Sequence, residues 1–279
     1  MKEKIKYLNL KEVQIEERKL LEKTIIFLDE NNIKYYIWAG SFLGAVRHQG
    51  FIPWDDDIDL AIPRKEYNEL INILKKKGCQ IDSTIEAIGF ELNNFDAPFL
   101  KFINKEIEVK EENNYDRNIW IDIFPLDGAP RNGRIFYKKI DLYRRIYFWK
   151  RSEYRNWKNK TNIIRRSFKK LILLFLRPIK YKYIIRSYIK LCSKYDTENT
   201  EFVCHNVWGV GEKEKFPKEM LLETSKYKFE DLEVTGIKDY DKWLTIRYGD
   251  YMKLPPEDKR ITHEFEAWRV EEDDKEIKE

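Results

Sequence analysis

The chain has 279 residues, of which 42% are hydrophobic and 37% charged, enough for one large folded core or two small ones. Its three cysteines, Cys79, Cys192 and Cys204, are odd in number and scattered, which argues against a disulfide framework and favours a reducing compartment. The longest apolar run, at residues 171–176, is far short of the roughly 20 residues of a membrane span, so we expect a cytoplasmic protein rather than a membrane-embedded one.

The predicted elements begin with an amphipathic helix at residues 10–31, where apolar residues recur at helical spacing among charged ones. Residues 34–38 (KYYIW) follow as a strand, and an Ala-Gly-Ser turn leads into a short helical stretch, FLGAVR. Further helices are predicted at residues 64–77 and 239–248, and further strands at residues 57–62, 85–92, 98–103, 106–110, 118–124, 201–210 and 228–235. Strands that alternate with helices predict an α/β (α+β) fold with a mixed sheet.

The strand at residues 57–62 (DIDLAI) alternates acidic and apolar residues. Period-two geometry places Asp57 and Asp59 on one face and turns Ile58 and Leu60 toward the core. Two carboxylates held this close resist joint ionisation unless a cation lies beside them. Mg²⁺ is commonly held by one or two carboxylates and substrate phosphates, so the pair predicts a site for Mg²⁺ or Mn²⁺. The structural alternative is a solvated strand edge or a helix cap.

The Gly40-Ser41 turn lies upstream, where a predicted strand meets a predicted helix. Free backbone N–H groups and a hydroxyl at a helix N-terminus suit a phosphate, although an ordinary capped turn has the same sequence. A third acid, Asp122, stands between apolar neighbours on the later strand NIWIDIF. Asp127 is the weaker candidate, because an Asp before Gly128 is typical of a turn.

Three stretches together resemble the LicD family of the nucleotidyltransferase superfamily: AGSFLGAVRHQGFIPWDDDIDLAIPRKEY at residues 39–67, WIDIFPLDG at 120–128 and YGDYMKLPPEDKRITHE at 248–264. The resemblance runs from about residue 10 to residue 128 and returns near the C-terminus. It implies a nucleotidyltransferase-like core that moves phosphocholine from CDP-choline onto a cell-surface glycan, such as lipopolysaccharide, teichoic acid or a capsule precursor. Fukutin-type relatives transfer ribitol phosphate from CDP-ribitol.

The signature does not specify the donor, so ribitol phosphate or phosphoethanolamine from another CDP-linked donor stays an alternative. Transfer of a nucleotide to a small molecule or a protein is a further alternative, as in more distant members of the superfamily. Outside the enzymes, the alternative is a protein that only binds a glycan or a nucleotide. Retention of the three acids argues against it, because unused buried carboxylates are costly.

The resemblance also assigns roles to the motif residues. It implies that Asp57 and Asp59 hold the divalent cation at the donor diphosphate, with Gly40 and Ser41 over the phosphates. Asp122 then either completes the metal site or acts as the general base toward the acceptor hydroxyl.

Four neighbouring residues are expected to support this site. Arg47 is predicted to bind a phosphate, with a surface salt bridge as the alternative. Lys101 is a second predicted phosphate ligand, unless it is an edge-strand lysine. Asp55 is expected to be structural, as a cap or a partner of Arg47. Asp56 is expected to support the metal ligands without binding the metal itself.

Choline is a quaternary ammonium, which aromatic faces bind through cation–π attraction. The aromatic residues of the matched motifs are therefore candidate substrate ligands, with a place in the core as the structural alternative. These candidates are Trp54, Trp120, Tyr248 and Tyr251, and His263 is a candidate hydrogen-bond donor beside them.

The strongest charge asymmetry lies in residues 134–194, which carry 20 Lys and Arg but only 2 Asp and Glu. The total formal charge is +4, so the rest of the chain carries −14. Aromatic and aliphatic residues interleave with these cations, as in helices that lie on an anionic membrane. A solvated basic insertion is the structural alternative, and nucleic acid is not expected because no nucleic-acid fold motif accompanies the charge.

The predicted organisation is a catalytic core at residues 1–130, a basic helical insertion at residues 131–200, and a C-terminal part at residues 201–279 that packs back on the core. With the basic insertion on the inner face of the cell membrane, the acceptor glycan is expected to be lipid-linked.

Overall fold

The computed structural model describes residues 4–111, 118–153, 172, 174–209, 211–260, 262 and 265–271. Its contacts divide the chain into two compact units. Unit 1 comprises Met1–Phe124 and Met220–Glu279, and unit 2 comprises Pro125–Glu219. The acidic motifs therefore belong to unit 1 and the basic segment to unit 2.

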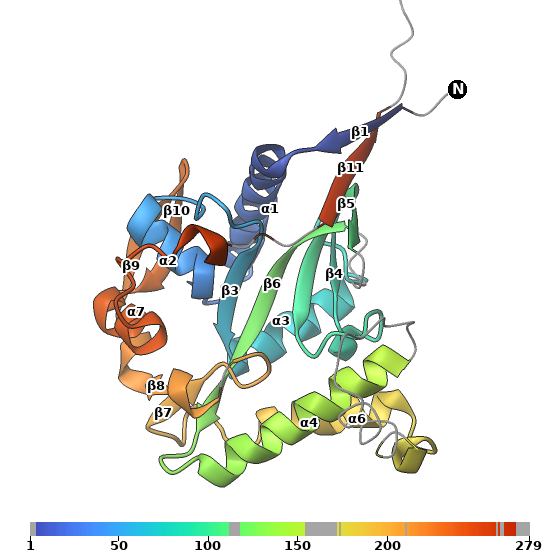
Figure 1. Cartoon of the computed structure of the whole chain (residues 1–279), viewed down its shortest axis with the longest axis vertical. Coiled ribbons are helices and arrows are strands. Elements are labelled where there is room, and N and C mark those ends of the chain that lie inside the picture. Colours follow the sequence, from blue (N-terminus) through green and yellow to red (C-terminus); the bar gives the residue numbers. More distant parts are fainter. Residues whose placement is uncertain are drawn as a thin grey trace, which may run out of the picture. The chain divides into compact units, whose positions relative to one another are not determined.

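Unit 1 is built of a sheet with helices against it (Figure 1). Its helices are α1 (Leu10–Glu30), α2 (Ala39–His48), α3 (Arg64–Lys76) and α7 (Tyr240–Tyr248). Its strands are β1 (Lys4–Leu8), β2 (Tyr36–Ile37), β3 (Ile58–Pro63), β4 (Ile85–Ile88), β5 (Leu100–Glu111), β9 (Thr224–Phe229), β10 (Leu232–Ile237) and β11 (Phe265–Glu271). The strand β6 (Asn118–Ala129) begins in unit 1 and continues into unit 2.

The main sheet has the strand order β1-β11-β5-β6-β3-β2, and β4 also pairs with β5. It contains parallel and antiparallel neighbours and is flanked by helices, so the predicted α/β fold with a mixed sheet is confirmed. A separate antiparallel hairpin joins β9 to β10.

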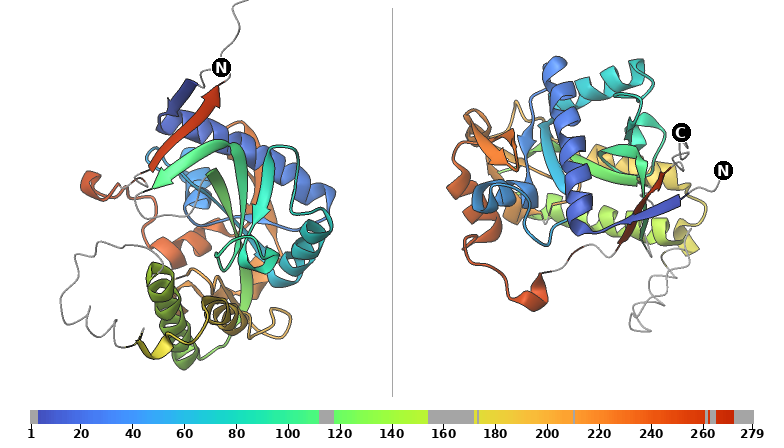
Figure 2. Two further views of the ribbon diagram at one scale, coloured as in Figure 1. Left: turned by 90° about the vertical axis from the view of Figure 1, so that its right-hand side faces the viewer. Right: turned by 90° about the horizontal axis from the view of Figure 1, so that it is seen from above.

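Helix α1 begins with a capping box. The Asn9 side chain accepts a hydrogen bond from the Glu12 backbone N–H at 3.1 Å, and the Glu12 carboxylate accepts one from the Asn9 N–H at 2.9 Å. Figure 2 shows α1 running alongside the sheet. Near its C-terminal end the Phe27 ring packs edge-on against Phe102 of β5, with ring centroids 6.2 Å apart. The predicted helix at residues 10–31 is therefore present and fixed against the central strands.

Helix α3 is fixed to the same strand by a buried hydroxyl. The Tyr67 side chain is fully buried, and its hydroxyl oxygen accepts a hydrogen bond from the Leu100 N–H at 2.8 Å. Because Leu100 is the first residue of β5, this bond joins α3 to the start of the strand.

Several strands differ from the sequence prediction. The segment predicted as one strand at residues 228–235 spans the turn between β9 and β10. The segments predicted at 98–103 and 106–110 form one strand, β5, whose pairing with β6 is irregular between Ile103 and Glu108. The strand β6 runs on to Ala129 instead of ending at residue 124, because residues 127–129 pair with a strand far along the chain. Strands β1 and β11, which pair antiparallel with each other, were not predicted.

Unit 2 contains helices α4 (Arg134–Glu153) and α6 (Tyr181–Cys192), and strands β7 (Phe202–Cys204) and β8 (Phe216–Pro217). The fully buried Tyr147 ring of α4 stacks on Tyr181 and Tyr188 of α6, each at a centroid distance of 5.9 Å. Helices were thus predicted correctly at both ends of the basic segment, while residues 154–171 lie outside the described residues.

Candidate functional site

The acidic motif lies where β3 begins. Asp57 directly precedes the strand, which starts one residue later than predicted, and Asp59 is its second residue. Ile58 and Leu60 are fully buried, so the predicted inward direction of these two side chains is confirmed. The Trp38 N–H donates to the Asp59 carbonyl oxygen at 2.9 Å, which joins the acidic strand to the end of β2.

The Gly-Ser turn lies beside these acids. The Ser41 Oγ atom accepts a hydrogen bond from the Asp59 N–H at 2.8 Å, so the hydroxyl holds the first turn of α2 against β3. A Cβ atom at Gly40 would lie 3.0 Å from the Asp55 carboxylate, so glycine leaves room for that side chain. Between them and β2, Ala39 has a φ of +43°, a conformation that is unfavourable for a residue with a side chain.

Asp59 lies within the electrostatic influence of the other acids of the group. Burial raises the pKa of Asp59 well above its usual range, and the charges of Asp57, Asp122 and Asp55 raise it further. The guanidinium of Arg247 on α7 acts in the opposite direction. The structure therefore brings together the three predicted acids, and adds Asp55 to them.

Asp122 has a cationic partner across the sheet. Lys101 stands directly opposite it in the register of β5 and β6, and the Lys101 Nζ atom lies 2.9 Å from the Asp122 Oδ1 atom. Both side chains are largely buried, at 9% and 13% exposure. The geometry is that of an ion pair rather than an aligned hydrogen bond. The Lys101 ammonium also lies 4.4 Å from the centre of the Trp120 ring.

Trp120 therefore lies in the core with a protein cation on its face, rather than as an open choline ligand. The ring is 4% exposed, and Lys101 occupies one face of it. The apolar cluster around it consists of Val13, Ile88, Ile103, Ile107, Val109, Ile119 and Ala267.

Arg47 and Tyr251 form a structural contact. The Arg47 Nη1 atom donates to the Tyr251 carbonyl oxygen at 2.7 Å, and its Nε atom donates to His48 at 2.9 Å. Burial lowers the pKa of Arg47. The Tyr251 hydroxyl donates to Asp241 at 2.7 Å. These bonds join the C-terminal end of α2 to the segment after α7, and they engage the Nε and Nη1 atoms of Arg47.

The remaining predicted substrate ligands lie in different surroundings. The Trp54 ring is covered by the Arg260 guanidinium at 4.9 Å from its centre. Tyr248 is 39% exposed, and its hydroxyl accepts a hydrogen bond from the Arg247 Nε atom at 3.1 Å. His263 lies outside the described residues. Asp56, expected to support the metal ligands, is buried at 2% exposure.

Two charged residues near the acids were not predicted. Glu17 of α1 is 1% exposed, and its pKa is raised well above the usual range by burial first and then by Asp57, Asp56 and Asp55. The sequence signal for Glu17 was its position, as an acid, on the apolar face of the helix predicted at residues 10–31. Arg247 had no such signal, because it lies one residue outside the matched C-terminal stretch.

A divalent cation fits this acid group. Among the residues that the structure describes, no three His, Cys, Asp or Glu side chains are already arranged to hold a metal. Mg²⁺ needs no such set, because one or two carboxylates and substrate phosphate oxygens usually hold it. Burial raises the pKa of Asp59 and the neighbouring acids raise it further, and a cation would relieve the repulsion from these acids. Carboxylate oxygens suit Mg²⁺ or Mn²⁺ better than softer metals.

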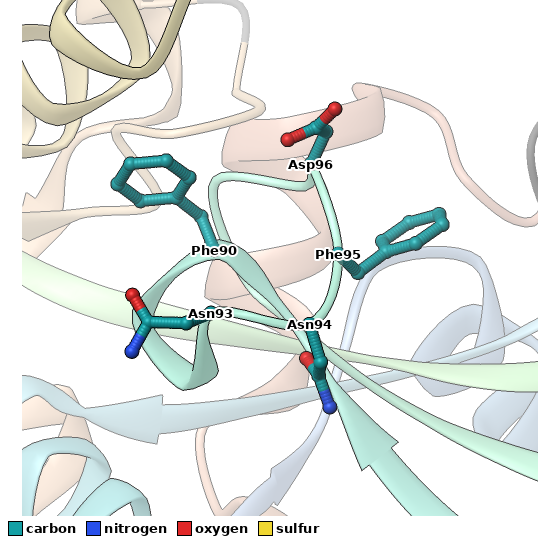
Figure 3. Close-up of a pocket in the computed structure, with 5 residues that line it drawn as sticks. All are labelled: Phe90, Asn93, Asn94, Phe95 and Asp96. Carbon is teal, nitrogen blue, oxygen red and sulfur yellow. The ribbon is translucent and has the colours of Figure 1, made fainter.

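A pocket of about 390 Å³ lies in the loop that leads into β5 (Figure 3). The loop is held by Asn94, whose amide donates to the Ala87 carbonyl and whose oxygen accepts from the Gly89 N–H, both at 2.9 Å. None of the predicted site residues lines the pocket. The lining residues are Phe90, Asn93, Asn94, Phe95 and Asp96.

Comparison with known proteins agrees with the family resemblance of the sequence motifs. Residues 32–160 match the family described as LicD/FKTN/FKRP, nucleotidyltransferase domain. Over 265 residues the chain is 27% identical to the lipopolysaccharide cholinephosphotransferase LicD of Haemophilus influenzae, a match that covers 94% of this chain and 98% of that protein. Over 107 residues it is 29% identical to the ribitol 5-phosphate transferase FKRP of Homo sapiens, covering 38% of this chain and 19% of that protein. The family resemblance that the signature predicted is therefore supported, and residues 32–160 match the nucleotidyltransferase domain of that family.

Proposed function

We propose that the protein is a phosphotransferase that moves phosphocholine from CDP-choline onto a cell-surface glycan, with Mg²⁺ or Mn²⁺ as its cofactor. The observation that carries the proposal is the group of carboxylates around Asp59, next to the Gly40-Ser41 turn. The match with the Haemophilus influenzae lipopolysaccharide cholinephosphotransferase over nearly the whole chain supports the choice of phosphocholine.

In the reaction, an acceptor hydroxyl oxygen attacks the phosphorus that bears choline. The bond from that phosphorus to the bridging oxygen breaks, and cytidine monophosphate leaves with the bridging oxygen. A bound divalent cation supplies positive charge at the phosphate oxygens and at the leaving group. In this scheme Asp57 and Asp59 hold the cation, while the backbone of Gly40 at the N-terminus of α2 faces a donor phosphate.

Asp122 has two alternative roles in this scheme. It either takes the proton of the acceptor hydroxyl or completes the metal site. In either role the ion pair with Lys101 fixes the position of the carboxylate. The two roles predict different results for Asp122→Asn. A general base changes the rate of transfer but not Mn²⁺ affinity, whereas a metal ligand changes both.

A second candidate donor is CDP-ribitol, with CDP-ethanolamine as a third. The similarity to the ribitol 5-phosphate transferase FKRP supports ribitol phosphate, but it covers only 38% of the chain. Nucleotide transfer to a small molecule or protein would use the same acids, whereas binding without catalysis would leave them unused.

Donor cleavage tests the proposal. The full chain is incubated with Mg²⁺ and CDP-choline, CDP-ribitol or CDP-ethanolamine. Water takes the place of the acceptor hydroxyl, and release of cytidine monophosphate is measured. We expect release from CDP-choline, its loss in Asp59→Asn, and no change in Asp29→Asn, an exposed acid at the end of α1. Release from none of the donors, or full release by Asp59→Asn, would overturn the proposal.

We also propose that unit 2 rests on an anionic membrane, which brings the site to a lipid-linked acceptor. Leu174, Phe175 and Tyr183 are 60%, 74% and 50% exposed, and the cations Arg177, Lys180, Lys182 and Arg186 are exposed beside them. Apolar side chains flanked by basic ones suit the interface of an anionic bilayer. Across the described ranges, none of the helices combines the length and apolar character needed to cross a membrane.

A further inference from the structure

Helix α1 places a buried carboxylate beside the acidic motif. Glu17 is 1% exposed, and its Oε2 atom has no hydrogen-bond partner among the described residues. One helical turn earlier, the Gln14 amide donates to the Asp55 carbonyl oxygen at 2.8 Å. Residues three apart lie on the same side of a helix, so Gln14 and Glu17 face the same acidic segment.

A carboxylate in this position is costly without a counter-charge. Burying an ionised group without a partner is strongly unfavourable, and the neighbouring acids Asp55, Asp56 and Asp57 add repulsion. The neutral carboxyl would remove the charge but would still leave the Oε2 atom without a hydrogen bond. By contrast, Glu16 on the same helix accepts from Arg269 at 2.6 Å and from Lys19 at 2.9 Å. Glu16 therefore has cationic partners within the chain. The charges that act most strongly on the neighbouring Glu17 all belong to acidic residues.

We propose that the Glu17 carboxylate is a further member of the divalent-cation site, contributed by a helix that precedes the matched nucleotidyltransferase domain. This inference rests on the cation of the proposed function. It adds a role for α1 beyond packing, because the helix completes the negative charge of the site. The ligand is a hard divalent cation, for which carboxylate oxygens are the preferred partners.

Mn²⁺ binding to the metal-free full chain tests this inference. Electron paramagnetic resonance gives the Kd for the unchanged chain, Glu17→Gln and Glu16→Gln. We expect Glu17→Gln to weaken Mn²⁺ binding by about 10- to 100-fold, the range seen when a residue supporting a metal site is removed. Glu16→Gln, the matched control, should leave the Kd unchanged. In chelator, Glu17→Gln should melt at a higher temperature than the unchanged chain, because a buried carboxyl without a partner is gone.

Equal Kd values for the unchanged chain and Glu17→Gln would overturn this inference and leave the proposed function standing. A chain that binds no Mn²⁺ at all would overturn both the inference and the cofactor of the proposed function. If Glu17→Gln does not fold, Glu17→Leu gives the same comparison with an apolar side chain that suits a buried helix position. Mn²⁺ binding by Glu17→Leu as tight as that of the unchanged chain would equally overturn the inference.

Discussion

Lys101 and Asp122 stand directly opposite each other on β5 and β6, with the ammonium nitrogen 2.9 Å from a carboxylate oxygen. The pair joins a predicted phosphate ligand to a predicted catalytic acid. Because Lys101 also lies against the Trp120 ring, its ammonium is fixed from two directions. The charge of Lys101 is thus directed at Asp122, and any donor phosphate would have to share it.

Removing Lys101 should therefore destabilise the fold. Lys101→Met leaves Asp122 as a buried acid without this cation, and breaking such a pair costs about 3–5 kcal/mol. The free energy of unfolding, measured in urea, gives the loss. The double variant Lys101→Met/Asp122→Leu should recover most of it, because an apolar pair can replace a buried ion pair at little cost. Equal stability of Lys101→Met and the unchanged chain would contradict this account of the pair.

Arg247 should bind a donor phosphate. Its guanidinium acts on Asp59 and lies over the rings of Trp243 and Tyr248, at 5.9 and 5.4 Å from their centres, which fixes its direction. Loss of a charged hydrogen bond of about 1.5–3 kcal/mol corresponds to about a 10- to 100-fold lower kcat/KM for CDP-choline in Arg247→Gln. Lys242→Gln, on the exposed side of the same helix, is the control. Unchanged kcat/KM in Arg247→Gln would remove this role.

The stability of unit 1 should depend on the ionisation of Asp82. Burial acts to raise the pKa of Asp82. Hydrogen bonds from Lys23, Thr84 and Ile85 outweigh this effect and lower the pKa from 3.8 to about 2. A lowered folded-state pKa adds stability that is fully present above 3.8 and is lost as the pH falls through about 2. Asp82→Asn keeps the side-chain oxygen that the backbone N–H groups use. Its deficit in melting temperature should be present at pH 7 and disappear near pH 2. A deficit that does not change with pH would contradict the ionic contribution.

Membrane binding by unit 2 should depend on its exposed apolar residues. The unchanged chain should co-sediment with vesicles rich in phosphatidylglycerol at low salt, and not with phosphatidylcholine vesicles. Phe175→Asp should weaken this binding by about 10-fold or more, because the ring would no longer leave water. Leu222→Asp in unit 1, where the side chain is 75% exposed, is the matched control. Equal loss in both variants would contradict a membrane surface on unit 2.

The sequence predicted the elements whose signal is local. The helix at 10–31 and the inward positions of Ile58 and Leu60 follow from hydrophobic period alone. Strands β1 and β11 were missed because neither is stable alone: Lys4–Leu8 pairs with Phe265–Glu271 at the other end of the chain, and local patterns carry no information on such partners. The extension of β6 through Gly128 depends in the same way on β7.

The residues of the candidate site that stand in sequence motifs were predictable. The residues that only tertiary folding brings to the site were not. Asp57, Asp59 and Asp122 stand in motifs, and the structure brings them together. The charges of Glu17 and Arg247 come from helices at opposite ends of the chain, and only folding places Glu17 near Asp57 and Arg247 near Asp59. Arg47 follows the Gly-Ser turn as the motif suggested, but tertiary packing directs it to the Tyr251 carbonyl.

The most direct test of the central claim is the fate of an oxygen atom. When CDP-choline is hydrolysed by the full chain in water enriched in ¹⁸O, with Mg²⁺ present, water takes the place of the acceptor hydroxyl. Mass spectrometry then shows which phosphorus was attacked. Transfer of phosphocholine predicts ¹⁸O in phosphocholine and none in cytidine monophosphate, with the label lost in Asp59→Asn. Label in cytidine monophosphate would mean attack on the nucleotide phosphorus, and would contradict the proposed reaction.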